Sequence, residues 1–267
     1  MIKHVVLVEL LEHFLLKEAP FEYIDTHAGA GLFNLKSNDA SKLKEHATGI
    51  GKLDPATFPE LASYFAAVRA YNKPGGCDIY PGSPAIARHF LRSQDRAWLF
   101  ELHPQDYPLL CKNMGSHRRI RVAHEDGLKG MAALLPPTSR RGLVLIDPSY
   151  EVKSDYDQVI ECMVKGHKKF SSGMYAIWYP VVERRRIEHM ERKLTLSGIR
   201  NIQRFELGLS ADAQGRGMNA AGMFVVNPPW KLFEKMTQVL PRLAQAIGES
   251  TGSSYGRFYR CDVLVKE

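Results

Sequence analysis

The sequence predicts an α/β fold, and three observations lead to this prediction. Helical and strand patterns alternate through most of the chain, which is typical of folds in which helices cover a mostly parallel sheet. A glycine-rich turn at residues 27–31 directly follows the first strand. Further strands then end in or just before acidic residues, at Glu101, Asp126 and Asp147.

Length and composition narrow the class of protein. The 267 residues suffice for one large domain, or for one domain with a sizeable insertion. No apolar run is long enough to cross a bilayer, so we expect no membrane span. The formal charge of +7 favours a polyanionic partner such as a nucleic acid, although a merely basic enzyme has the same composition. Four well-separated cysteines without a C-x-x-C pair suit a reducing cytoplasm and predict no zinc site.

The elements follow from the hydrophobic pattern. Residues 4–16 carry apolar side chains at helical spacing and predict a leading helix, and residues 59–70 predict another. Residues 143–147 are the clearest buried strand, because four apolar residues run into an acid. The other strands are expected at residues 21–25, 97–101, 119–123, 174–179, 202–209 and 222–226. The last 20 residues or so look loosely specified.

The gap between the first two strands predicts an insertion. In a dinucleotide-binding unit, the acid that meets the ribose follows the glycines by about 20 residues. Here Glu101 lies 70 residues after Gly31, which is too far for one crossover helix. We therefore expect a main domain of residues 1–40 and 84–267, with residues 41–83 forming an inserted helical subdomain.

The glycine-rich turn is a candidate ligand site. Glycines such as Gly29 let the backbone turn sharply and leave room for a ligand against the main chain. A phosphate-binding loop is disfavoured, because no lysine-serine/threonine pair follows. A purely structural turn remains the alternative, with His27 packed in the loop.

The strand-end acids point to a nucleoside. A carboxylate at Glu101 can accept hydrogen bonds from ribose hydroxyls, and Asp126 with Gly127 would lie near an adenine amino group. Each acid could instead be a helix cap. Three successive acid-ended strands after a glycine turn make a shared site the better interpretation.

Asp147-Pro148-Ser149-Tyr150 indicates the reaction. An amino group conjugated to a purine is a weak nucleophile, because its lone pair is delocalised into the ring. The Asp147 carboxylate and the Pro148 carbonyl can accept hydrogen bonds from both amino hydrogens and draw that lone pair out of conjugation. Tyr150 offers a face on which a base can stack. The alternative is an Asp-Pro turn with a buried tyrosine.

A second motif of the same kind occurs at residues 227–230, Asn-Pro-Pro-Trp, also after an apolar strand. Chain order separates the two motifs. Asp147 closes the fourth expected strand, the third after the glycine turn, which predicts a place at the carboxyl edge of the sheet. Asn227 closes the last expected strand and is interpreted as structural.

Basic clusters occur at residues 117–119, 139–141, 165–169 and 184–186. Each could contact phosphates or simply be a solvated face. Together with Trp178 and Tyr179, they make an RNA-binding surface plausible.

These residues resemble the RlmJ family of 23S ribosomal RNA adenine-N6 methyltransferases, formerly described as proteins for using external DNA as a nutrient. The resemblance extends from about Lys3 to Trp230. It depends on the motifs at residues 23–31, 80–84, 101–104, 140–147, 175–180 and 217–230. It implies a Rossmann-like class I methyltransferase fold with an inserted helical subdomain.

The resemblance also implies cofactor and partner. S-adenosyl-L-methionine would be bound by Lys3, His4, His27, Gly29, Ser83, Glu101, Asp126, Gly127 and Asp147. Asp147, with Pro148 and Tyr150, would carry out the reaction on a flipped adenine, and no metal is needed. The partner would be 23S rRNA free of ribosomal proteins, and the protein a cytoplasmic monomer without membrane contact.

Two departures from the family pattern leave alternatives open. The family reads Asp-Pro-Pro-Tyr where this chain has Ser149, and the family carries a segment rich in histidine, tyrosine and asparagine ahead of Lys3 within which this sequence starts. A DNA adenine methyltransferase would share every motif. A catalytically silent nucleic-acid-binding protein linked to use of external DNA is the other alternative, although no nuclease constellation supports the nutrient role.

Overall fold

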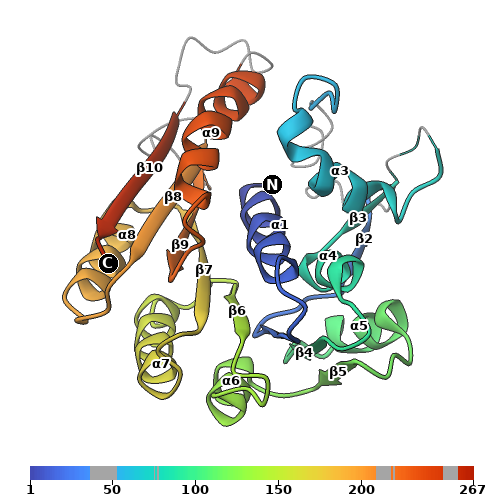
Figure 1. Cartoon of the computed structure of the whole chain (residues 1–267), viewed down its shortest axis with the longest axis horizontal. Coiled ribbons are helices and arrows are strands. Elements are labelled where there is room, and N and C mark those ends of the chain that lie inside the picture. The colour runs from blue at the N-terminus through green and yellow to red at the C-terminus, as the bar shows by residue number, and fades with distance from the viewer. Residues whose placement is uncertain (37–52, 75, 77, 209–217, 219, 249–257) are drawn as a thin grey trace.

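The computed structural model describes residues 1–36, 53–74, 76, 78–208, 218, 220–248 and 258–267. A mixed sheet forms its centre, with the order β10-β8-β9-β7-β6-β1-β4-β5 (Figure 1). The neighbours β5, β4, β1, β6 and β7 run parallel, whereas β9 and β10 are antiparallel to the strands they pair with. The strands are β1 (Glu22–Asp25), β4 (Arg96–Phe100), β5 (Ile120–Ala123), β6 (Gly142–Ile146), β7 (Met174–Val181), β8 (Ile202–Gly208), β9 (Ala220–Val226) and β10 (Phe258–Val265). The predicted α/β fold is confirmed.

Helices cover both faces of the sheet, and strand side chains alternate between two cores. On β6, Leu143 and Leu145 pack into one core and Val144 and Ile146 into the other. The first core is completed by α1 (Ile2–Leu15), α4 (Ser83–Phe90), α5 (Asp106–Met114) and α9 (Leu232–Gly248), and the second by α6 (Gly127–Leu134), α7 (Asp155–Lys169) and α8 (Arg184–Thr195). Because β6 is covered on both sides, all its residues are buried, which explains its continuous apolar sequence.

The predicted insertion at residues 41–83 is described only in part, because residues 41–52 lie outside the described residues. Its described part contains a short 3-10 helix (Pro59–Leu61), α3 (Ala62–Arg69) and β3 (Ile79–Pro81). β3 pairs with β2 (Leu32–Asn34) in a small antiparallel sheet that the sequence did not indicate. The division into two domains stays a prediction.

The expectation of a loosely specified C-terminus was wrong for residues 258–265. They form β10, which pairs with β8 along its length. Its side chains are mostly half-buried, so the sequence lacks the strict alternation that marks a strand with one solvated face. The strand forms because it pairs with β8, and this pairing cannot be recognised in the sequence. Leu209, at the end of the predicted 202–209 strand, lies outside the described residues.

Chain order creates a crevice at one edge of the sheet. From β1 the chain proceeds outward to β4 and β5, and then returns to the other side of β1 to form β6. Open α/β sheets bind ligands at such a switch point, outside the carboxyl ends of the strands. The ends of β1 and β6, at Asp25 and Ile146, therefore position the candidate site. No helix in the described part of the chain has the length and apolar character needed to cross a membrane.

Candidate active site

A cavity of about 690 Å³ opens at the carboxyl ends of β1, β4 and β6. Segments distant in sequence meet here: the start of α1, the turn after β1, the start of α4, and the loops after β4 and β6. Seven of the residues that the sequence predicts for the site line this cavity: Lys3, His4, His27, Gly29, Ser83, Glu101 and Asp147. The glycine turn and the acid that follows β6 thus share one pocket, as the sequence predicts.

A smaller cavity of about 200 Å³ adjoins the first one. Asp126, Gly127 and Pro148 line it. The two cavities share His27 and Ser149 on their walls, so they lie side by side. All the predicted site residues except Tyr150 line one or the other of them.

The glycine turn is held against the end of β4 by Glu101. Gly29 has a φ of +60°, which favours glycine, and its N–H donates to Glu101 Oε2 at 2.6 Å. The N–H of His103 donates to Glu101 Oε1 at 2.7 Å. Each carboxylate oxygen retains a lone pair, so Glu101 can still accept hydrogen bonds from a ligand.

Gly127 lies against the end of β1. A Cβ atom added there would lie 1.9 Å from the Thr26 carbonyl oxygen, so only glycine fits. Asp126 caps α6, because its Oδ1 accepts hydrogen bonds from the N–H groups of Leu128 at 3.0 Å and Lys129 at 3.3 Å. The capping alternative therefore holds for Asp126, and the residue also lines the smaller cavity.

The Asp147 side chain is only 11% exposed and forms an ion pair with Lys3, 144 positions away in the sequence. Burial raises the pKa of Asp147, and the Lys3 ammonium opposes this by favouring the carboxylate. The ammonium also lies 5.9 Å from the centroid of the Trp178 ring. The cofactor role predicted for Lys3 does not include this pairing, which only the fold reveals.

Asp25 is a charged residue that the sequence-based site prediction missed. It is fully buried at the end of β1, and the Tyr23 hydroxyl donates to its Oδ2 at 2.7 Å. Burial raises the pKa of Asp25 from 3.8 to about 6, and hydrogen bonds from Ser83 and Tyr23 oppose this change. The signal was present, since Asp25 opens the glycine motif and directly ends the strand.

Both predicted site histidines are neutral at neutral pH. Burial lowers the pKa of His27 to about 4, and burial lowers that of His4 well below its usual value. His27 Nδ1 lies 2.8 Å from Thr26 Oγ1, and His4 Nδ1 lies 2.8 Å from the Tyr80 hydroxyl. Within the described residues, His4 Nε2 is buried without a hydrogen-bond partner, so a polar atom is available at the cavity wall.

Tyr150 lines neither cavity. Its ring is buried, with its centroid 4.5 Å from that of Tyr156, and its hydroxyl donates to the Trp178 carbonyl at 2.6 Å. This arrangement is the packed tyrosine that the Asp-Pro turn alternative described. Its role in stacking a base stays a prediction. Ser149, rather than Tyr150, faces the cavities.

The competing motif at residues 227–230 lies at the other edge of the sheet. Because β9 is antiparallel to β7, Asn227 follows Val226 next to the start of β7. The Asn227 side chain donates to the carbonyls of Ser171 at 2.8 Å and Gly173 at 2.7 Å. It therefore fixes the loop before β7, well away from the cavity.

Two of the basic clusters contain arginines whose side chains already bind groups of the protein itself. Arg141 donates to the carbonyls of Phe14 and Ala19 and thus holds a loop, while Arg184 pairs with the buried Glu206. Nowhere in the described ranges do three or more histidine, cysteine, aspartate or glutamate side chains gather as metal ligands would.

Comparison with known proteins identifies the family. The family model described as "Ribosomal RNA large subunit methyltransferase D, RlmJ" matches residues 18–258. The chain belongs to the RlmJ family. The Haemophilus influenzae protein "Ribosomal RNA large subunit methyltransferase J" is 46% identical over 257 residues, covering 94% of this chain and 91% of that protein. The Escherichia coli protein of the same name is 47% identical over 244 residues, covering 91% and 87%.

A solved structure agrees with this assignment. The crystal structure of a Legionella pneumophila protein is 34% identical, with a TM-score of 0.87 over 98% of this chain and 95% of that chain. The RlmJ-family chain is therefore an S-adenosylmethionine-dependent methyltransferase with a Rossmann-like fold, as the sequence resemblance implies.

Proposed function

We propose that the protein transfers the methyl group of S-adenosylmethionine to the N6 amino group of an adenine in 23S rRNA. Membership of the RlmJ family supports rRNA as the substrate. The observation that carries the proposal is the shared cavity, which is lined both by the glycine turn and by the Asp147 carboxylate, only 11% exposed.

The residues around the two cavities fit the cofactor. S-adenosylmethionine has a positively charged sulfonium, a ribose and an adenine, and it supplies an electrophilic methyl group. The acids Asp25, which is fully buried, and Asp147, which is nearly so, favour a cation at this edge. Glu101 keeps lone pairs for ribose hydroxyls, and Asp126 with Gly127 lines the smaller cavity, where adenine would bind. Gly29, Ser83, His27 and His4 complete the wall, and His4 Nε2 is a polar atom without a partner in the described chain.

Asp147 and Pro148 would act on the target adenine. The Asp147 carboxylate and the Pro148 carbonyl accept hydrogen bonds from the two amino hydrogens and keep the N6 lone pair out of conjugation. Lys3 favours the ionised carboxylate, in which both oxygens act only as hydrogen-bond acceptors. Most of the rate gain comes from position and electrostatics.

Asp147→Ala tests the proposal. We expect methyl transfer to deproteinised 23S rRNA to be abolished, because the acceptor of the amino hydrogens is gone. Binding of S-adenosylhomocysteine, measured by calorimetry, should be nearly unchanged. Asn227→Ala is the matched control: it alters the same kind of motif at the opposite edge and should keep its turnover. Turnover at the wild-type rate in Asp147→Ala would remove Asp147 from the mechanism.

The same assay defines the substrate further. Parallel reactions on rRNA, assembled subunits and duplex DNA test the proposal that the enzyme uses rRNA free of ribosomal proteins. Methylation of duplex DNA alone would instead support a DNA adenine methyltransferase. We also propose that the protein acts as a cytoplasmic monomer, which sedimentation and fractionation would check.

A further inference from the structure

A basic groove lies at the edge of the sheet opposite the active-site cavity. A cavity of about 670 Å³ opens where β4 and β5 begin. Four arginines, Arg96, Arg118, Arg119 and Arg121, line it, and the first, second and fourth of these are exposed. We call this cavity and its four arginines the β4–β5 groove.

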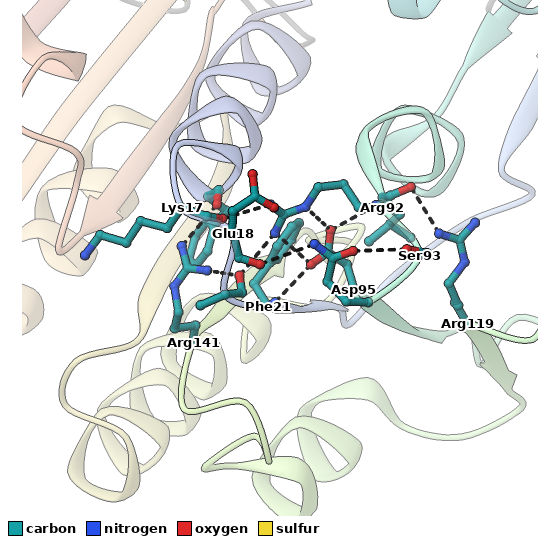
Figure 2. Close-up of polar contacts among 12 residues, drawn as sticks. Lys17, Glu18, Phe21, Arg92, Ser93, Asp95, Arg119 and Arg141 are labelled. Carbon is teal, nitrogen blue, oxygen red and sulfur yellow. Dashed lines mark hydrogen bonds and ion pairs between the residues drawn. The ribbon is translucent and has the colours of Figure 1, made fainter.

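The charge of the β4–β5 groove is not neutralised by carboxylates. Asp95 also lines the cavity, but it is fully buried and accepts hydrogen bonds from Arg92 Nε at 2.8 Å and Arg92 Nη2 at 3.0 Å (Figure 2). Arg119 donates to the Leu91 carbonyl at 3.3 Å (Figure 2). Across the described residues, no carboxylate forms an ion pair with any of the four groove arginines.

Arginines toward the other end of the sheet, unlike those of the β4–β5 groove, form ion pairs with carboxylates. Arg184 pairs with Glu206 at 2.8 Å, and Arg186 pairs with Glu183 at 2.8 Å. Those pairs satisfy the guanidinium groups within the protein. The groove arginines keep most of their donors available, and a planar guanidinium matches the geometry of phosphate oxygens.

The sheet places two of these arginines, Arg96 and Arg121, on one face. In the parallel β4–β5 pair, Trp98 lies opposite Arg121, so both side chains leave the same side. Arg96 lies two residues before Trp98 on β4 and shares that side, whereas Arg118 and Arg119 lie in the turn that leads into β5. The Trp98 indole donates to Glu22 Oε2 at 2.9 Å, which fixes it as a half-buried aromatic part of the groove wall.

We propose that the β4–β5 groove binds the phosphate backbone of the rRNA segment that flanks the target adenine, and this rests on the proposed function. Strand β4 links the two places, since Arg96 lies in the groove and Glu101 at the active-site cavity. Five residues of strand span about 17 Å, and the target adenine at Asp147 lies about 10 Å farther across the sheet, because β1 separates β4 from β6. A nucleic-acid strand with a rise of about 3.4 Å per phosphate covers the resulting diagonal of about 20 Å with about six nucleotides. One RNA can therefore occupy both places.

The double variant Arg96→Gln/Arg121→Gln tests the groove. For an rRNA fragment that carries the flanking sequence, we expect Kd to rise about tenfold. The slope of log Kd against log salt should fall by about 2, one for each lost phosphate contact. At saturating RNA, kcat should be unchanged, as should S-adenosylhomocysteine binding. Arg96→Lys/Arg121→Lys should restore most of the affinity, because the charge is retained.

The matched control is Lys231→Gln/Lys266→Gln, which removes the same charge from exposed positions outside the basic clusters. Kd and salt slope equal to wild type in the arginine variant, or an equal loss in the lysine variant, would overturn the groove proposal. RNA binding is measured without methylation, so the two proposals fail separately. Absence of methyl transfer by the wild type would end the proposed function, whereas unchanged binding by the arginine variant would end only the groove.

Discussion

Replacing Asp25 with asparagine measures the cost of a charge buried beneath the active site. Asp25 is fully buried beside the Tyr23 hydroxyl, and burial raises its pKa from 3.8 to about 6. Asparagine keeps an oxygen that can accept the Tyr23 hydrogen bond, but it cannot ionise. The substitution therefore removes the pH-dependent part of the stability at this position and leaves its shape nearly intact.

The magnitude follows from the two pKa values. Because the folded pKa is the higher one, the unfolded chain releases the proton first as pH rises. Stability is therefore greatest below the unfolded pKa of 3.8 and falls until pH passes the folded pKa of about 6. The total loss is about 3 kcal/mol, of which about 1 kcal/mol falls between pH 5 and pH 7.

Urea unfolding of the wild type and Asp25→Asn at pH 5 and pH 7 provides the assay. We expect the variant's free energy of unfolding, relative to wild type, to rise by about 1 kcal/mol between these values. Asp95→Asn is the control, because it removes a buried aspartate whose pKa is lowered rather than raised in the folded protein. Burial works against ionisation there, but hydrogen bonds from Arg92 hold the pKa of Asp95 below its usual value. Its difference from wild type should be constant over the same range. A constant difference for Asp25→Asn as well would refute the reasoning.

Two further substitutions test the site architecture. Gly127→Ala should lower the free energy of unfolding by about 3 kcal/mol or more, because its Cβ would lie 1.9 Å from the Thr26 carbonyl oxygen. Gly198→Ala, where a Cβ has open space and only the φ of +79° is unfavourable, should cost about 1 kcal/mol, and equal melting temperatures for the two would contradict the close approach. Tyr150→Phe should cost about 1 kcal/mol by removing the 2.6 Å hydrogen bond to the Trp178 carbonyl, while leaving kcat unchanged. A loss of kcat without a loss of stability would show that the Tyr150 hydroxyl acts in the reaction.

Local pattern was enough to predict the main strands and the residues that end them. Four apolar residues running into Asp147 identify a buried strand and its end, and the glycines after Asp25 mark the turn. These features depend on neighbours in the sequence, so they can be read without the fold. The short sheet of β2 and β3 and the edge strand β10 could not be predicted, because pairing with distant strands stabilises them.

The assignment of Asp147 over Asn227 came from chain order, and the strand directions show its physical basis. An antiparallel strand carries its final residue to the opposite edge, which is where Asn227 lies. The ion pair of Lys3 with Asp147 and the raised pKa of Asp25 depend on burial and on contacts between distant segments. The sequence by itself determined which groups could do the chemistry. Only the tertiary structure decided their surroundings, because desolvation and Coulomb energy depend on position in space.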